Sequence, residues 1–270
     1  MANNTVYPNK VIEAKAKDIL TTQINARSMM TIDTSLTQDA GMTKTITTYT
    51  YNGTAEEVAA GSGNSTRGSI TYVANDYTVK MVQQPFDYLD EDFMKDPVIV
   101  DFGINGATSV MSNKMTSDFY SALATKGSGS TELVKGITFA KGKALSYDVI
   151  VDAISELNLE DESKIFIVIP NVWKAALRKD PDYKSALMGE VIYNGQVGTV
   201  CGIPVIATKA LTDKAYVMTN EAVTLFLKKD VEVEQERDAD KRKNSVYLRS
   251  CYVCALRDAT KACKITEAAS

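Results

Sequence analysis

The most constraining feature of this chain is a pair of extended, Thr- and Tyr-rich runs joined by a Gly-rich segment. The first run spans residues 43–51 and the second spans residues 69–82. Both runs are dense in β-branched and aromatic residues, which favours strands. At about 3.3 Å per residue they would reach roughly 30 to 45 Å. An isolated two-stranded hairpin is only marginally stable in water, so we expect this ribbon to lie on another molecule.

The segment between the runs, residues 54–68, is the expected tip of the ribbon. Its glycines, with Ser and Asn, predict a mobile loop. Gly61-Ser62-Gly63 lacks the Lys-Ser or Lys-Thr pair of a phosphate-binding loop and lacks a following helix, so the sequence does not predict nucleotide binding there. Tyr combines a large apolar area with a polar tip, which suits an interface. The ribbon residues expected to contact a neighbouring subunit are Tyr49, Tyr51, Arg67, Tyr72 and Tyr77.

Composition places the chain among ordinary soluble globular proteins. It has 270 residues, of which 44% are hydrophobic and 24% charged, and no apolar run approaches the roughly 20 residues of a membrane span. Residues 1–8 lack the features of a secretory signal, so a cytosolic origin is expected. The net charge of -4, with scattered Lys and Arg, gives no electrostatic argument for direct nucleic-acid binding, although an acidic wall could still enclose nucleic acid.

Enzymatic and metal chemistry are disfavoured by the residue types present. The chain has no histidine, which removes the commonest general base and every imidazole-based triad. Cys251 and Cys254 have zinc-like spacing, but residues three apart in a strand face opposite sides, so we expect buried thiols and no metal or cofactor. The acidic groups at residues 87–92 and 160–162 are interpreted as solvated charges, with a catalytic carboxylate pair as the less favoured alternative.

Helical patterns flank the ribbon on both sides. Apolar residues between Val11 and Ile24 form one helix face, which fits either a core helix or an arm that packs on a neighbouring subunit. A longer helix is predicted from Asp96 to Thr125, because Asp96 can cap it, Pro97 suits its first turn and Gly127 follows its end. The apolar stripe expected in its core comprises Ile104, Ala107, Met111, Met115, Phe119, Ala122 and Leu123.

The sequence pattern changes after the flexible link at residues 126–131. A helix beginning near Ser146, a fully apolar strand at residues 165–169 and glycine turns within residues 192–207 predict an α/β domain. Two short strands are expected at residues 215–218 and 223–228. The runs 231–237 and 245–256 then predict a second long hairpin around a charged loop, with a last strand near residues 264–266.

This order of elements resembles the major capsid proteins of tailed bacteriophages, which have the HK97-like α+β fold. The sequence details that carry the resemblance are Gln83-Gln84-Pro85, the run from Gly198 to Ile206, and Tyr247-Leu248-Arg249 with Ala255 to Asp258. The resemblance divides the chain into an N-terminal arm (1–42), an E-loop hairpin (43–84), a P-domain part with the spine helix (85–139), an A-domain (140–230), and closing P-domain strands with the C-terminus (231–270).

The resemblance implies a structural function without catalysis or cofactor. Copies of the chain would form pentamers and hexamers that build an icosahedral virion shell, enclosing double-stranded DNA without sequence-specific binding, after synthesis in the bacterial host cytoplasm. Because the chain begins directly with the arm, a separate scaffolding protein is implied, with a portal and decoration proteins as further partners. The charged loop is expected to meet its symmetry mates near a local threefold axis. Its expected contact residues are Asp238, Asp240, Lys241, Arg242 and Lys243.

Other functions remain as alternatives. An encapsulin-type nanocompartment would share the fold and enclose protein cargo in place of a genome. A tail-fibre or surface adhesin would suit the Thr-rich run, but it predicts repeats that the sequence lacks. Lys44 and Lys80 lie on the ribbon, but no residue pattern identifies the Asn and acid that a covalent isopeptide crosslink would need, so none is predicted.

Overall fold

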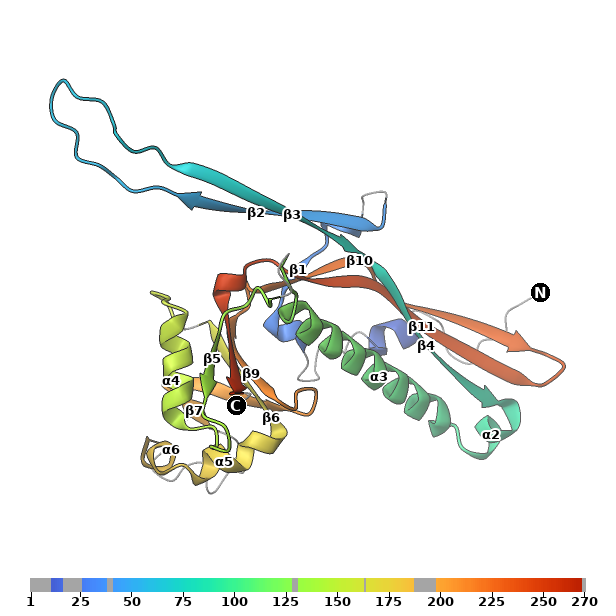
Figure 1. The fold of residues 1–270 in the computed structure, drawn as a ribbon. Coiled ribbons are helices and arrows are strands. Elements are labelled where there is room, and N and C mark those ends of the chain that lie inside the picture. The colour runs from blue at the N-terminus through green and yellow to red at the C-terminus, as the bar shows by residue number, and fades with distance from the viewer. Residues whose placement is uncertain are drawn as a thin grey trace.

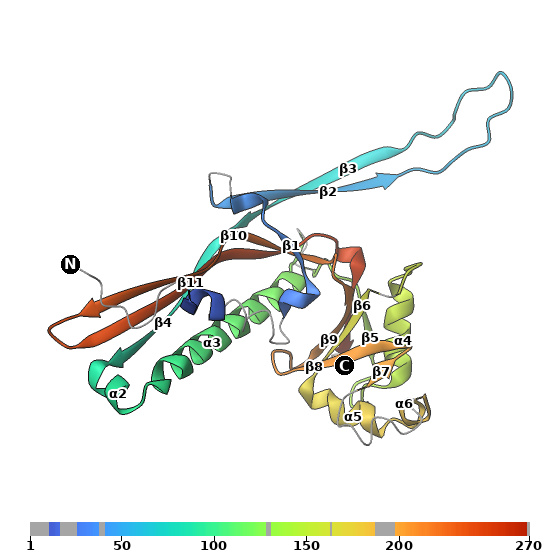
Figure 2. The ribbon, with the colours of Figure 1, turned by 180° about the vertical axis from the view of Figure 1, so that it is seen from behind.

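The computed structural model describes residues 11–16, 26–37, 41–127, 131–162, 164–186 and 198–268, apart from the side chains of residues 48–50, 73 and 184–186. The molecule is elongated and has three parts (Figure 1): a ribbon that projects from one end, a central sheet crossed by a long helix, and an α/β domain. The same arrangement seen from behind shows that the ribbon and the α/β domain both extend from the central sheet (Figure 2).

The central sheet has four strands in the order β1-β10-β11-β4. The long strands β10 (Val223–Asp238) and β11 (Lys243–Leu256) are antiparallel, β4 (Lys80–Leu89) pairs with β11, and the short β1 (Thr31–Asp33) runs parallel to the start of β10. The predicted second hairpin is therefore confirmed as β10 and β11. Alternating residues of its outer half, such as Val233 and Leu248, are buried on one face of the sheet.

The long helix α3 (Val98–Leu123) packs on that face. Its predicted start is confirmed, since an Asp96 carboxylate oxygen accepts a hydrogen bond from the Val98 N–H at 3.0 Å. The predicted apolar stripe is buried along its whole length. Gly103 is needed for close packing, because a Cβ at this position would lie 2.5 Å from the ring of Phe86.

The α/β domain is built on a six-stranded mixed sheet in the order β5-β12-β9-β6-β8-β7. Its strands are β5 (Gly136–Phe139), β6 (Ile165–Pro170), β7 (Thr199–Val200), β8 (Ile203–Thr208), β9 (Lys214–Thr219) and β12 (Ala262–Glu267). The helices are α4 (Tyr147–Glu156), α5 (Lys174–Lys179) and α6 (Pro181–Ala186). Ile150 and Ile154 of α4 belong to the same buried cluster as Ile167 and Ile169 of β6, as the apolar patterns predict.

Several predicted domain boundaries differ from the observed strand pairing. β4 pairs with β11, so residues 80–84 belong to the central sheet and not to the ribbon. Residues 223–230 form the first half of β10, which continues through an irregularity of register near Lys229. At the other end, β12 joins the α/β sheet by pairing with β9 and β5. Pairing over long sequence distances decides these memberships.

The described part of the N-terminal arm packs on its own subunit. Residues 11–16 are helical, and Ile12 and Ala16 are buried against α3 and the central sheet. Lys15 Nζ lies 2.7 Å from a carboxylate oxygen of Asp101 on α3. Between the two readings of this helix, these contacts support a core helix for residues 11–16, while residues 17–25 and 38–40 lie outside the described part of the chain. The short 3-10 helices η1 (Ala26–Met29) and η2 (Ser35–Thr37) flank β1.

A Lys-Glu-Lys cluster joins the segment after α3 to the α/β sheet. The mostly buried carboxylate of Glu132 lies 2.9 Å from Lys214 Nζ on β9 and 2.5 Å from Lys264 Nζ on β12. Burial opposes the charge of Glu132, but the hydrogen bonds from the two lysines outweigh it and hold the pKa of this carboxyl below its ordinary value of 4.5. The cluster therefore stabilises the folded chain when Glu132 is ionised.

Replacing this carboxylate is expected to destabilise the fold. Glu132→Gln should lower the free energy of unfolding by about 1 to 3 kcal/mol at neutral pH, because two partly buried ammonium groups lose their negatively charged acceptor. Because the folded pKa is depressed, the contribution is present above pH 4.5 and is lost as pH falls. Denaturant unfolding at pH 7 and pH 3.5 should show the difference from the unaltered chain shrinking at the lower pH. The exposed Glu160→Gln is the control, and an equal loss in both variants would contradict the assignment.

Candidate assembly surfaces

The ribbon is a two-stranded sheet of its own. Strands β2 (Thr43–Asn52) and β3 (Ser69–Thr78) are antiparallel, in a register that runs from Thr43 opposite Thr78 to Asn52 opposite Ser69. It projects away from the rest of the subunit in both views (Figures 1 and 2). Every residue from 51 to 72 is exposed. The predicted hairpin is thus observed, and its distal part lacks support from the body of its own subunit.

The exposed part of the ribbon carries large apolar side chains. Tyr51, Ile70 and Tyr72 are 68%, 68% and 70% exposed. The ring of Tyr51 lies over Gly53 and Gly68, occupying the space where a side chain at either glycine would begin. Such an aromatic, uncharged surface is the composition found in the cores of protein interfaces. The side chain of Tyr49 lies outside the described part of the structure, and Arg67 is exposed at the tip, as expected.

Tyr77 has a different position from the other ribbon tyrosines. It lies at the base of the ribbon, where it is partly buried, and its Oη donates a hydrogen bond to the Leu256 carbonyl oxygen at 3.3 Å. It packs against a small cluster that includes Val79 and Phe226, and burial raises the pKa of its hydroxyl. Tyr77 therefore anchors the ribbon to its own subunit, and its expected contact with a neighbouring subunit stays a prediction.

The charged loop between β10 and β11 forms ion pairs within its own subunit. Arg242 lies 3.2 Å from Glu91 and Lys243 lies 2.6 Å from Asp87. The hydrogen bond with Lys243 lowers the pKa of Asp87. The sequence placed the partners of these cations on symmetry mates, and it treated the acidic groups near α2 (Asp90–Lys95) as solvated charges. The register of β4 against β11 explains the difference, because it places Asp87 opposite Ser245, close to the loop.

The acids of the same loop are used to shape it. A carboxylate oxygen of Asp238 accepts hydrogen bonds from the N–H groups of Asp240 and Lys241, at 3.1 and 3.2 Å. The Asp238 carboxylate also lies 3.6 Å from Lys241 Nζ. The Lys241 side chain nevertheless remains 74% exposed. The loop is thus a preformed charged tip, and Lys241 is more exposed than Asp238 and Arg242.

A second exposed apolar surface lies on the outer face of α3. Val98, Phe102 and Val110 are 62%, 78% and 51% exposed, at spacings of four and eight residues along one side of the helix. Met94, just before α3, is 79% exposed. The buried stripe of this helix was predicted from the sequence, whereas the outer stripe was not. Large exposed apolar side chains at regular spacing are typical of a surface that another molecule covers.

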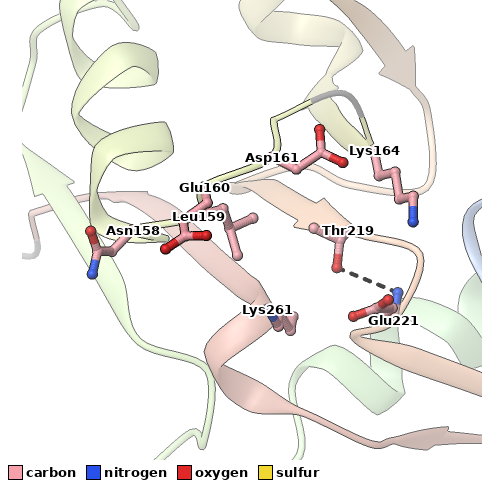
Figure 3. Close-up of a pocket in the computed structure, with 8 residues that line it drawn as sticks. All are labelled: Asn158, Leu159, Glu160, Asp161, Lys164, Thr219, Glu221 and Lys261. Carbon is pink, nitrogen blue, oxygen red and sulfur yellow. Dashed lines mark hydrogen bonds between the residues drawn. The ribbon is translucent and has the colours of Figure 1, made fainter.

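One surface hollow, of about 440 Å³, lies beside the end of α4 (Figure 3). Glu160, Asp161 and Glu221 line it together with Lys164 and Lys261, so that acids and amines are mixed.

Across the part of the chain that the structure describes, no three His, Cys, Asp or Glu side chains gather as metal ligands. Within that same part, no helix is long and apolar enough to cross a membrane.

The cysteines divide into three buried thiols and one exposed thiol. Cys251, Cys254 and Cys263 are buried, and burial raises the pKa of Cys254 to about 12 and of Cys263 to about 11. Cys201 is exposed, contrary to the expectation of a buried thiol. It occupies the turn between β7 and β8 with a φ of 52°.

Together, the projecting ribbon, the long helix on a four-stranded sheet and the mixed α/β domain define the HK97-like capsid fold, and the predicted α+β class is confirmed. The capsid of Ralstonia phage GP4 matches with a TM-score of 0.65 and 10% identity, over 88% of this chain and 87% of that chain. A virus-like particle from Pyrococcus furiosus matches with a TM-score of 0.60 and 10% identity, over 95% and 98% of the two chains.

A sequence relative supports the same similarity. The major capsid protein of Staphylococcus phage phiMR11 is 24% identical over 273 residues, which cover 98% of this chain and 94% of that protein. No protein-family model matches the chain. The resemblance to the major capsid proteins of tailed bacteriophages, predicted from the order of the elements, is confirmed by these similarities.

Proposed function

We propose that this chain is the major structural protein of a bacteriophage capsid and that its copies assemble into an icosahedral shell. The observation that carries the proposal is the ribbon. It projects from a subunit with the capsid fold, and it exposes Tyr51, Ile70 and Tyr72 without support from the body of its own subunit. A heterologous contact, in which the ribbon of one copy lies on a different surface of the next, builds rings when the rotation between successive copies closes. The chain's role is structural and includes no enzymatic step.

The arrangement of the subunits in the shell and the partners of the shell are part of the same proposal. Pentamers and hexamers would form around the α/β domains, with double-stranded DNA enclosed in the virion after synthesis in the host cytoplasm. The net charge of -4 supports enclosure over direct binding of DNA. A separate scaffolding protein, a portal and decoration proteins are the partners that such a shell would use. The exposed Lys241, at the tip of the β10–β11 hairpin, is the candidate contact near the threefold axis.

An encapsulin-type compartment is the alternative with the same fold. The similarity to a virus-like particle from Pyrococcus furiosus is the observation that keeps this alternative open. The relative that aligns over 98% of this chain is a phage major capsid protein, which favours the viral shell.

Purification followed by negative-stain electron microscopy tests the proposal. The chain is expected to form closed shells or rings of subunits as its concentration rises, and sedimentation should show a large assembly beside the monomer. Absorbance at 260 and 280 nm and gel analysis of purified particles would then separate enclosed nucleic acid from a protein cargo. A chain that stays monomeric at the highest attainable concentration, and when co-produced with the neighbouring structural proteins of its genome, would contradict the proposal.

A further inference from the structure

One carboxylate crosses the ribbon tip. Glu56 accepts hydrogen bonds from the N–H groups of Ser65 and Thr66 at 3.0 and 3.1 Å. It also accepts hydrogen bonds from their hydroxyl groups, at 2.5 and 3.0 Å. Ser65 and Thr66 lie nine and ten positions after Glu56 in the sequence, on the opposite limb of the tip. The carboxylate therefore closes a loop in a segment that has no helix and no strand pairing.

The closed loop contains one further turn. The Ser62 N–H donates a hydrogen bond to the Ala59 carbonyl oxygen at 3.0 Å, and Gly61 takes a φ of 89°, which favours glycine. The sequence predicted a mobile tip from its glycines and small polar residues. In the structure, the hydrogen bonds of Glu56 join the two limbs of this tip.

We propose that Glu56 is a positioning residue for assembly, which shapes the ribbon tip before it docks on a second copy of this chain. This inference rests on the proposed function. Ordering a flexible loop costs roughly 1 to 2 kcal/mol per residue in backbone entropy, and a loop ordered in advance avoids that cost at the moment of binding. A tip of this length would otherwise lose much of the free energy gained by docking.

The hydrogen bonding engages Glu56 with the loop itself. Its carboxylate accepts four hydrogen bonds from Ser65 and Thr66, three at Oε2 and one at Oε1. The same donors lower the pKa of Glu56 to about 2, so the carboxylate is ionised throughout the neutral range. The neighbouring Val58 and Arg67 are exposed, which leaves them available to make the contacts.

Glu56→Gln tests the role, with Glu57→Gln as the matched control. Both changes remove one negative charge from adjacent, exposed positions, but only the first removes the crossing carboxylate. In the unassembled protein, amide hydrogen exchange at Ser65 and Thr66 should quicken in Glu56→Gln and stay unchanged in Glu57→Gln. Assembly, followed by light scattering, should need about tenfold more protein in Glu56→Gln, the equivalent of roughly 1.4 kcal/mol. Unfolding temperatures of both variants should match that of the unaltered chain.

A covalent replacement distinguishes shaping of the loop from direct contact. In the double variant Glu56→Cys with Ser65→Cys, a disulfide should restore assembly under oxidising conditions, and reduction should abolish the restoration. Equal impairment of Glu56→Gln and Glu57→Gln, unchanged exchange at Ser65 and Thr66, or failure of the formed disulfide to restore assembly would each overturn the inference. If the unaltered chain itself forms no particles, the proposed function fails instead, and the exchange measurement still decides whether Glu56 shapes the tip.

Discussion

A chain whose residues 53–68 are replaced by Asn-Gly is expected to remain folded and to lose shell assembly almost completely. Asn52 and Ser69 face each other at the end of the ribbon, so a two-residue Asn-Gly turn can join them without altering the register. The removed residues are all exposed and contribute nothing to the buried clusters. The unfolding temperature should therefore stay within a few degrees of that of the unaltered chain.

Assembly should respond strongly because the deletion removes the tip, with the exposed Val58 and Arg67, from every interface of the shell at once, although Tyr51, Ile70 and Tyr72 remain. A loss of about 3 kcal/mol per contact corresponds to roughly a hundredfold weaker association. Sedimentation and negative-stain microscopy at matched concentrations would measure the loss. The informative control is Ser62→Gly, which keeps the length of the tip and the residues expected to make the contacts. Normal particles from the deletion would show that the ribbon tip is not an assembly element.

The ribbon and the long helix were predictable because their signals are local. The β-branched and aromatic content of residues 43–51 fixed a strand, and Asp96 and Pro97 marked the start of α3 within two residues. The limits of the ribbon were not predictable in the same way. Residues 77–82 have one continuous strand-like composition, yet Thr78 pairs with Thr43 and Lys80 pairs with Tyr252. Only the long-range register decides where the ribbon ends and the central sheet begins.

The residues expected to make inter-subunit contacts show the same difference between local signals and long-range pairing. Exposure of Tyr51, Tyr72 and Arg67 was expected because the ribbon sequence offers few apolar residues for them to pack against. The partners of Arg242 and Lys243 lie about 150 residues earlier, at Glu91 and Asp87, and no local spacing announces such pairs. The Glu56 contacts with Ser65 and Thr66 are nearer in sequence, but Glu, Ser and Thr in a loop also fit a solvated segment.

Removing one ring from the centre of the molecule should have the largest effect on folding. Phe119 on α3 is 0% exposed and belongs to the cluster that joins the central sheet to the α/β sheet, through residues such as Leu225 and Met218. Its ring lies 5.0 Å from that of Tyr120 in an edge-to-face arrangement. Phe119→Ala should lower the free energy of unfolding by about 3 to 5 kcal/mol, because it removes buried area and leaves a cavity. For a domain of this size we expect a fall in Tm of roughly 10 °C.

The same helix supplies the matched control. Phe102 has the same side chain but is 78% exposed, so Phe102→Ala should change the free energy of unfolding by less than about 0.5 kcal/mol. Differential scanning calorimetry of both variants as unassembled protein separates the effect of burial from that of the residue type, because both are Phe→Ala substitutions on the same helix. If both variants lost stability equally, α3 would have to be covered on both faces within one subunit, and its outer apolar stripe could not serve assembly. A large loss at Phe119 alone leaves that stripe free to be covered by another molecule.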